Sequence, residues 1–126
     1  MAVWWTVTCD ARDPHALAAF WAAALGYVPE PGYDEPDAAS IVDPDGRGPA
    51  ISFQRVPEPK TAKNRLHLDV RPAVRSLDPA ERTRLIRAKA DELVALGASE
   101  VREQRYGDEL GHVVLRDPEG HEFCVA

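Results

Sequence analysis

One pattern occurs twice in this chain of 126 residues. Each half holds a strand-like segment, an Asp-Pro pair, a helical stretch that ends in Leu-Gly, more strand-like segments and an Asp-Pro-acidic-Gly turn. The two turns are Asp43–Gly46 and Asp117–Gly120. A single such motif carries little information, but its recurrence in the same order indicates an internal repeat. Because one unit cannot cover its own sheet, we expect the two units to pair.

A polar, Pro-containing stretch near the middle of the chain separates the two copies. We place unit one at about residues 1–56, the connector at 57–64 and unit two at 65–126. The length is that of one domain, residues 1–126, with room for a hydrophobic core. The two cysteines, Cys9 and Cys124, show no zinc-like spacing, and we expect no disulfide between them.

The elements of unit one follow from its residue pattern. Asp13 is suited to cap a helix, Pro14 to its first position and Gly26 to its end, which predicts a helix over 14–25. β-branched, aromatic and alternating residues predict strands at 3–9, 27–30, 39–42 and 50–55. We expect Trp5 in the core, and Phe20, Trp21 and Leu25 against the sheet beside Val7, Ile51 and Phe53.

Unit two repeats this plan. Strict alternation predicts a strand over 65–71, and Asp78-Pro79 opens a helix that Gly97 ends, with Glu81 at the position for a capping box. The apolar stripe of this helix is predicted to comprise Leu85, Ala88, Leu93 and Leu96. Further strands are expected at 99–104, 112–116 and 122–125.

In these sequence motifs the chain resembles the vicinal oxygen chelate superfamily, and within it the glyoxalase-like and bleomycin-resistance-like proteins. The most specific pieces are FWAAALGY, NRLHLDV and DPEGHEFCV, and the resemblance covers essentially the whole chain. It implies an α+β fold in which two paired βαβββ units form curved mixed sheets around a cavity, the glyoxalase/bleomycin resistance/dioxygenase fold. It also implies a homodimer.

The resemblance places metal-ligand positions at Thr6, Gln54, His67 and Cys124. Divalent cations of this kind prefer carboxylate and imidazole ligands, so only Gln54 and His67 are ordinary choices. We therefore expect no cofactor and no metal. The alternative is one divalent metal (zinc, nickel, manganese or iron) held by His67, Gln54, Glu122 and Cys124.

Side chains that face the implied cavity by strand alternation are the candidate ligand-binding residues. They are Trp4, Thr6, Thr8, Ser52, Gln54, His67, Asp69, Glu122 and Cys124. His67 is interpreted either as a pocket wall or as a base tuned by Asp69 or Glu122. Cys124 is a nucleophile only if His67 lies within hydrogen-bond reach, and otherwise a small packed residue. His112 and Arg116 are either readers of an anionic group or surface residues. No catalytic residue is assigned.

The function that these observations favour is small-molecule binding without the family's usual divalent metal. The alternative is a metal-dependent lyase, isomerase or dioxygenase acting on a small carbonyl or aromatic compound. A net charge of −6 suits a cationic ligand and weighs against a nucleic-acid partner. No segment has the roughly 18 apolar residues of a membrane span or the pattern of a secretory leader, so a membrane partner is not expected and the predicted location is cytoplasmic.

Overall fold

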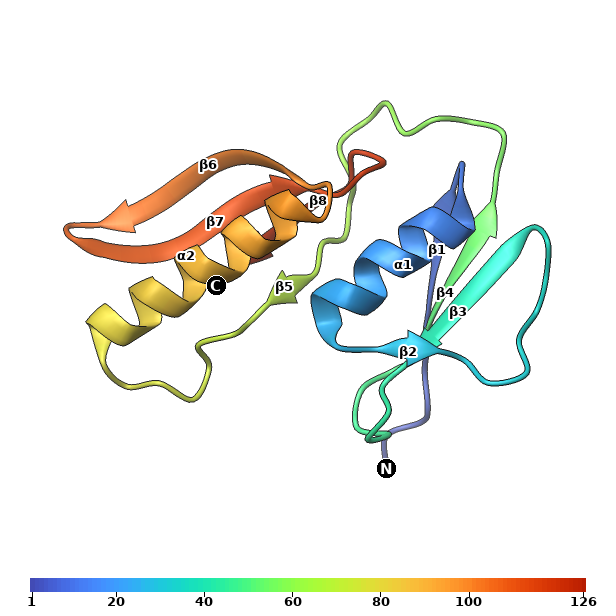
Figure 1. Cartoon of the computed structure of the whole chain (residues 1–126), viewed down its shortest axis with the longest axis horizontal. Helices are drawn as coiled ribbons and strands as arrows, with labels where there is room; N and C mark the ends of the chain where they lie inside the picture. Colours follow the sequence, from blue (N-terminus) through green and yellow to red (C-terminus); the bar gives the residue numbers. More distant parts are fainter. The chain divides into compact units, whose positions relative to one another are not determined.

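The computed structural model describes all residues, 1–126, as two compact units. Unit one comprises Met1–Pro59 and unit two comprises Lys60–Ala126. Each unit contains one helix and one four-stranded mixed sheet (Figure 1), so the predicted α+β class with two βαβββ units is confirmed. No helix has the length and apolar character that crossing a membrane requires.

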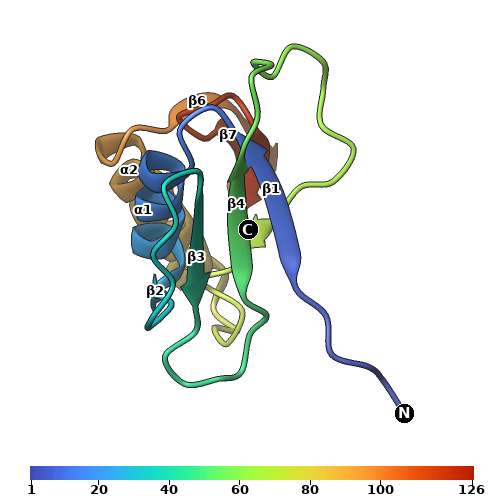
Figure 2. The ribbon, with the colours of Figure 1, turned by 90° about the vertical axis from the view of Figure 1, so that its right-hand side faces the viewer.

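Unit one follows the predicted order of elements. Its members are β1 (Val7–Ala11), α1 (Pro14–Leu25), β2 (Val28–Pro29), β3 (Ala38–Val42) and β4 (Ile51–Arg55). The strand order is β1-β4-β3-β2, with β1 parallel to β4 and the other neighbours antiparallel. Figure 2 shows α1 along one face of this sheet, which leaves the opposite face for a site.

Helix α1 has the predicted bounds because its two ends are capped as expected. The Asp13 carboxylate accepts a hydrogen bond from the Ala16 N–H at 3.1 Å, and Gly26 stops the helix at a φ of 72°. Phe20 and Trp21 pack edge to face, with ring centroids 5.3 Å apart. Both rings are buried, as are Ile51 and Phe53 on β4, which confirms the predicted apolar layer, although Leu25 is only half-buried.

Unit two has the same strand order and sense as unit one. It comprises β5 (Asp69–Val70), α2 (Pro79–Ala95), β6 (Ser99–Tyr106), β7 (Glu109–Arg116) and β8 (Glu122–Val125), in the sheet order β5-β8-β7-β6. Again the first strand pairs parallel with the last, and the other neighbours are antiparallel. The core beneath α2 contains Val113, Leu115, Phe123 and Val125.

The Asp-Pro-acidic-Gly turns of the two units have the same internal bonding. The Asp43 carboxylate accepts hydrogen bonds from the N–H groups of Asp45, Arg47 and Gly48. The Asp117 carboxylate likewise accepts from Glu119 and His121. In each turn the glycine N–H bonds back to the aspartate carbonyl. The repeated sequence motif is therefore a repeated local structure.

The first strand starts later than predicted, at Val7 instead of Val3. The Val7 N–H bonds to the Ala50 carbonyl, and the preceding partner residue is Pro49, which has no N–H to continue the ladder. Trp4 and Trp5 therefore precede β1 and are 97% and 63% exposed. The expectation that Trp5 is a core residue was wrong.

The strand predicted at 65–71 is reduced to β5, and Leu66 and Leu68 are exposed. Upstream of β5 the side-chain amide of Asn64 replaces the backbone hydrogen bonds that a longer strand would form with β8. It donates to the Glu122 carbonyl at 3.2 Å and accepts from the Glu122 N–H at 2.9 Å. A side chain thus satisfies the edge of β8 where backbone pairing was predicted.

Two further corrections concern α2 and the hairpin that follows it. The buried stripe of α2 is Ile86, Ala90 and Leu93, whereas Ala88 and Leu96 are exposed. Glu81 does not complete a capping box but binds Arg84. The strands after α2 are longer than predicted because a tight turn at Gly107 and Asp108 joins them directly.

Candidate functional site

The face of the unit-two sheet that lies opposite α2 is polar and hollowed. The hollow has a volume of about 460 Å³. Its lining comes from every strand of unit two and from the segment before β5: Lys63, His67, Asp69, Arg71, Arg102, His112, Val114, Glu122, Phe123, Cys124 and Ala126. Four of the nine predicted site residues, namely His67, Asp69, Glu122 and Cys124, lie here together.

Strand register explains why these side chains meet. Arg102 pairs with Val114, Val114 with Cys124, and Cys124 with Asp69. These four residues form one row across the sheet, and paired residues in adjacent strands point to the same face. A parallel row contains Arg116 and Glu122, which also pair directly.

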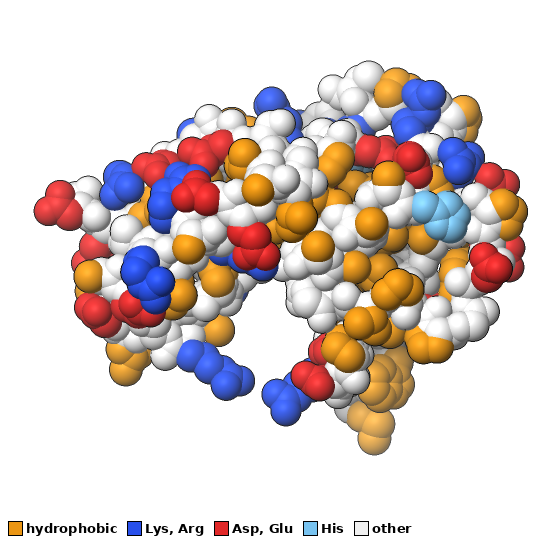
Figure 3. All heavy atoms as spheres, in the orientation of Figure 1, with side chains coloured by type: hydrophobic (Ala, Val, Ile, Leu, Met, Phe, Trp, Pro, Cys, Tyr) orange, Lys and Arg blue, Asp and Glu red, His pale blue; other side chains and the backbone are white.

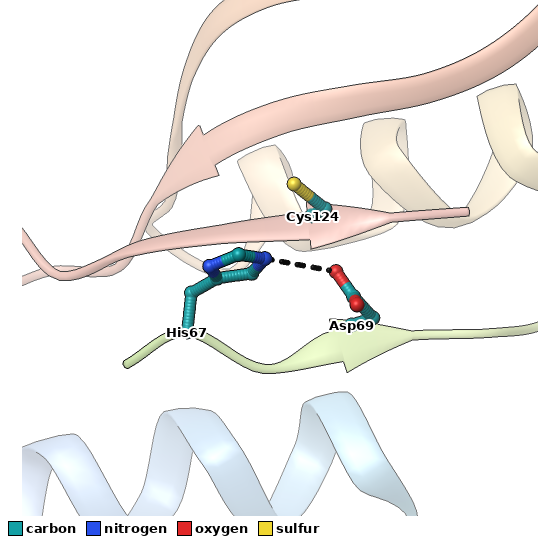
Figure 4. Close-up of side chains that lie close together, drawn as sticks. All are labelled: His67, Asp69 and Cys124. Carbon is teal, nitrogen blue, oxygen red and sulfur yellow. Dashed lines mark ion pairs between the residues drawn. The ribbon is translucent and has the colours of Figure 1, made fainter. Parts of the chain in front are cut away.

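His67, Asp69 and Cys124 form the most compact polar cluster of the hollow (Figure 4). His67 Nε2 lies 3.3 Å from Asp69 Oδ1, and one donor atom of each of the three residues lies within 4.8 Å of the others. His67 and Asp69 are about half exposed, whereas Cys124 is more buried. The cluster is open to solvent on one side, as a ligand site requires.

The electrostatics of Cys124 oppose a nucleophilic role. Burial raises the pKa of its thiol, and the negative charge of Asp69 raises that pKa further. Nucleophilic cysteines need the opposite environment, because the thiolate is the reactive form. No hydrogen bond links the thiol to His67, so the condition set for the nucleophile hypothesis is not met.

Glu122 is held by two cations. Its carboxylate lies 2.5 Å from Lys63 Nζ and 3.5 Å from an Arg116 guanidinium nitrogen. The hydrogen bond from Lys63 lowers the pKa of Glu122, and Arg116 acts in the same direction. Glu122 is therefore a charged structural partner in the wall of the hollow.

The predicted site residues of unit one lie on that unit's own sheet. Thr8, Ser52 and Gln54 line a hollow of about 560 Å³. Thr8 pairs with Ser52, and Asp10 pairs with Gln54. Trp4 and Thr6 precede β1 and do not line this hollow.

The register also corrects the match between the two repeats. Phe53 on β4 and Phe123 on β8 are the equivalent buried residues, so Gln54 corresponds to Cys124. Gln54 pairs with Asp10 and Cys124 pairs with Asp69. Two residues earlier on the first strand of each unit, the counterpart of His67 is Thr8, not Thr6. The position assigned to Thr6 is thus shifted by two residues.

Arg71 and Arg102 are site residues that the sequence interpretation missed. Both line the unit-two hollow. Alternation already placed Arg71 on the face of His67 and Asp69, so that signal was present in the sequence. Arg102 could not be placed in the same way, because a bulge between Glu100 and Arg102 interrupts the pairing of β6.

The donor set of the cluster decides which metals it fits. An imidazole nitrogen, a carboxylate oxygen and a thiol sulfur suit zinc, whereas manganese and magnesium prefer oxygen-rich sites. The predicted metal set is only partly present in the cluster. His67 and Cys124 belong to it, Glu122 is engaged by Lys63, and Gln54 belongs to unit one. Asp69 supplies the carboxylate instead.

Two α+β units of βαβββ order, with a polar hollow in unit two, define the class of fold. The model of the family described as "Glyoxalase-like domain" matches residues 6–126. The chain belongs to this family. No curated protein matches the chain.

Solved structures share the fold across nearly the whole chain. A glyoxalase/bleomycin resistance protein/dioxygenase family enzyme from Burkholderia phytofirmans is 19% identical, with a TM-score of 0.69 over 95% of this chain and 94% of that chain. A glyoxalase-related enzyme from Fulvimarina pelagi is 20% identical, with a TM-score of 0.67 over 99% and 86%. A mutant of the fosfomycin resistance protein FosX from Listeria monocytogenes, complexed with Mn(II) and 1S,2S-dihydroxypropylphosphonic acid, is 14% identical, with a TM-score of 0.69 over 99% and 89%. At these identities the similarity establishes the fold.

Proposed function

We propose that this glyoxalase-like protein binds a small molecule in the hollow of unit two and does so without a resident metal. The observation that carries the proposal is the row of register-paired side chains from Arg102 to Asp69 beneath a hollow of about 460 Å³. Small-molecule sites commonly measure roughly 300–1,000 Å³ and combine an apolar lining with a few polar groups. Val114 and Ala126 supply the apolar part here, whereas the buried ring of Phe123 belongs to the core beneath α2.

Metal-free binding is supported by how the donor groups are engaged. The Cys124 thiol has a raised pKa and is protonated near neutral pH. Asp69 is paired with His67, and Glu122 with Lys63. Arg102 lies close enough to influence the Cys124 thiol, and a guanidinium beside the cluster opposes a bound cation electrostatically.

NMR mapping tests this proposal on the full chain. A chelator-treated, ¹⁵N-labelled sample is titrated with small carboxylic acids, phosphonates, amines and polyols. We expect saturable amide shifts for at least one class, centred on Asp69, Val114 and Cys124. His67→Ala should weaken that binding, whereas His15→Ala in unit one should not. Saturable shifts centred elsewhere, or none from any class, would overturn the proposal.

The second candidate function is zinc-dependent lyase or isomerase chemistry. The specific observation in its favour is the convergence of His67, Asp69 and Cys124 donor atoms within 4.8 Å. Those three residues would hold the ion, and zinc would polarise a carbonyl oxygen of the substrate. The Mn(II) complex of FosX, a protein with the same fold, also supports a metal-dependent alternative.

Zinc addition separates the two candidates. Equimolar zinc should leave the melting temperature of the chelator-treated chain unchanged if the cluster is not a metal site. A rise in melting temperature that Cys124→Ser abolishes would favour the zinc enzyme, because binding to the folded state stabilises it.

We also infer that the chain forms a homodimer and acts in the cytoplasm, as the family resemblance suggests. Exposed apolar side chains of unit two, among them Leu66 and Leu77, would gain from burial against a second copy. Sedimentation velocity should show a dimer at micromolar concentration, and a monomer throughout that range would contradict this inference.

A further inference from the structure

We infer that the ligand of the unit-two hollow carries an oxyanion, which binds between Arg71 and Arg102 above a floor of small side chains. This inference rests on the proposed function and names the ligand's chemical class. The starting observation is the local charge. The hollow is lined by the basic side chains of Lys63, Arg71 and Arg102 but by only two acidic side chains, Asp69 and Glu122, although the whole chain has a net charge of −6.

The two carboxylates of the hollow are already engaged. Asp69 is paired with His67, at 3.3 Å. Glu122 is paired with Lys63 and with Arg116. Each acidic side chain of the lining therefore has a closer partner than Arg71 or Arg102, and neither arginine forms an ion pair with it.

Arg71 and Arg102 are the cations that remain uncompensated. Arg102 donates a hydrogen bond to the neutral amide oxygen of Gln104, at 3.2 Å. Arg71 is exposed and forms no ion pair. A guanidinium offers several donors in a fixed plane and binds carboxylate or phosphate groups in bidentate fashion. Two such groups at one hollow favour an anionic ligand.

The shape of the sheet face places these arginines on opposite sides of the ligand. Arg71 directly follows β5, at one edge of the sheet, and Arg102 lies on β6, at the other edge. The three strand spacings between these edges amount to about 14 Å, and Arg71 lies two residues beyond Asp69, the residue that shares a row with Arg102. Val114, Cys124 and Ala126 form the floor, and their short side chains leave the depression that the longer edge residues surround.

His112 adds a third group that can donate to an anion. It lines the hollow from β7, where it pairs with Gln104. The hollow of unit one differs, because its lining contains the acidic residues Glu35 and Asp37 and one arginine, Arg55, which is paired with Asp37. The two hollows of the chain therefore have different ligand chemistry, and the oxyanion site belongs to unit two.

Isothermal titration and NMR mapping at constant ionic strength test this inference. The probes are inorganic phosphate, methylphosphonate and acetate, with tetramethylammonium and acetamide as cationic and neutral controls. We expect at least one oxyanion to bind at the floor residues and the controls to bind at least tenfold more weakly. Comparison of phosphate, methylphosphonate and acetate then identifies the oxyanion that fits.

Matched substitutions locate the site. Arg71→Gln and Arg102→Gln should each weaken oxyanion binding about tenfold, the usual size of a lost charged hydrogen bond. Arg75→Gln, an exposed position of unit two outside the hollow, should leave binding unchanged. Equal losses in all three variants would indicate nonspecific charge attraction and overturn the inference.

Two other outcomes separate this inference from the proposed function. If neutral or cationic molecules bind the floor residues as tightly as oxyanions, the oxyanion inference fails and the proposed function stands. If none of these probes, and none of the compounds named for the test of the proposed function, shifts the amide signals of the floor residues, both the oxyanion inference and the proposed function fail. If Arg71→Gln and Arg102→Gln, combined in one chain, change the sedimentation coefficient but not oxyanion binding, the face is an interface between copies and the inference is overturned.

Discussion

Asp69 on β5 lies directly opposite Cys124 on β8, and it is the charge that most strongly opposes ionisation of that thiol. Burial is the larger cause of the raised pKa, and the Asp69 carboxylate is the next. The same carboxylate also pairs with His67. A single edge residue therefore acts electrostatically on the cysteine and pairs with the histidine.

Asp69→Asn should increase the rate at which Cys124 reacts with iodoacetamide at pH 8. Loss of the negative charge lowers the pKa of the thiol, so more thiolate is present at that pH. Because burial remains, the pKa should stay above that of a free cysteine. Mass spectrometry of the alkylated peptides measures the rate, with Cys9 as the internal reference. An unchanged or slower rate at Cys124 would show that Asp69 does not act on it electrostatically.

Glu122→Gln should make the stability of the chain less sensitive to acid. Lys63 and Arg116 lower the pKa of Glu122 in the folded state, so its contribution is fully present above the unfolded value, about pH 4.3. That contribution is lost as the pH falls through the lower, folded value. Urea unfolding between about pH 5 and pH 3 should therefore show a shallower loss for Glu122→Gln than for the wild type. Glu58→Gln, at an exposed position, should retain the wild-type slope.

Asp117→Ala should lower the free energy of unfolding by about 1–3 kcal/mol, the usual cost of leaving buried polar groups unsatisfied. Asp117 is 3% exposed and accepts hydrogen bonds from the N–H groups of Glu119 and His121. The turn places β8, which carries Glu122 and Cys124. Asp45→Ala, at an exposed position in the corresponding turn of unit one, is the control and should cost little. Equal costs for the two variants would mean that the Asp117 bonds are not significant.

Phe20→Ala should lower the free energy of unfolding by about 3–5 kcal/mol, because it removes a buried ring from the core of unit one. Its edge-to-face contact with Trp21 is lost as well. Chemical denaturation gives the measurement, and Leu77→Ala, at a side chain that is 96% exposed, provides the comparison. A shift near zero for Phe20→Ala would contradict the packing of α1 against the sheet.

The doubled sequence pattern predicted the fold because each element carries its own local signal. Asp13, Pro14 and Gly26 define α1 to the residue. The predictions failed where tertiary partners decide the outcome. Trp5 has strand character but no partner strand beyond Val7, since Pro49 ends the ladder. The stripe of α2 was misplaced because Ala88 and Leu93 are five residues apart, whereas the buried residues Ile86, Ala90 and Leu93 have the spacing of four and three that one helix face requires.

The exposed face of α2 is rich in charged side chains. Figure 3 shows basic and acidic side chains next to one another over α2. Arg87 alone pairs with Asp91 on the helix and with Glu100 and Glu103 on β6. The run of charges in this helix is thus a solvated face with ion pairs to the sheet, as its sequence suggests. The helix stripe itself had to be found from Ile86, Ala90 and Leu93 at helical spacing.

The sequence predicted which side chains of one strand share a face, but not which residues of different strands lie together in the candidate site. Alternation placed His67, Asp69 and Arg71 on one face, and that part of the cluster is local. The pairing of Cys124 with Asp69 depends on the register of two strands that are far apart in the sequence. Positions counted from the turn motifs matched that register in unit two. In unit one the same counting selected Thr6, two residues before Thr8, which is the true counterpart of His67. Ion pairs such as Lys63 with Glu122 involve a connector whose path the sequence does not specify.

Metal content per chain tests the central claim most directly. The full chain, purified without a chelator or a metal-affinity step, is subjected to elemental analysis for zinc, nickel, manganese and iron. Metal-free binding at the unit-two hollow predicts far less than one equivalent of any of these metals. About one equivalent of zinc per chain, reduced by Cys124→Ser and by Asp69→Asn, would contradict the account and identify the cluster as a metal centre.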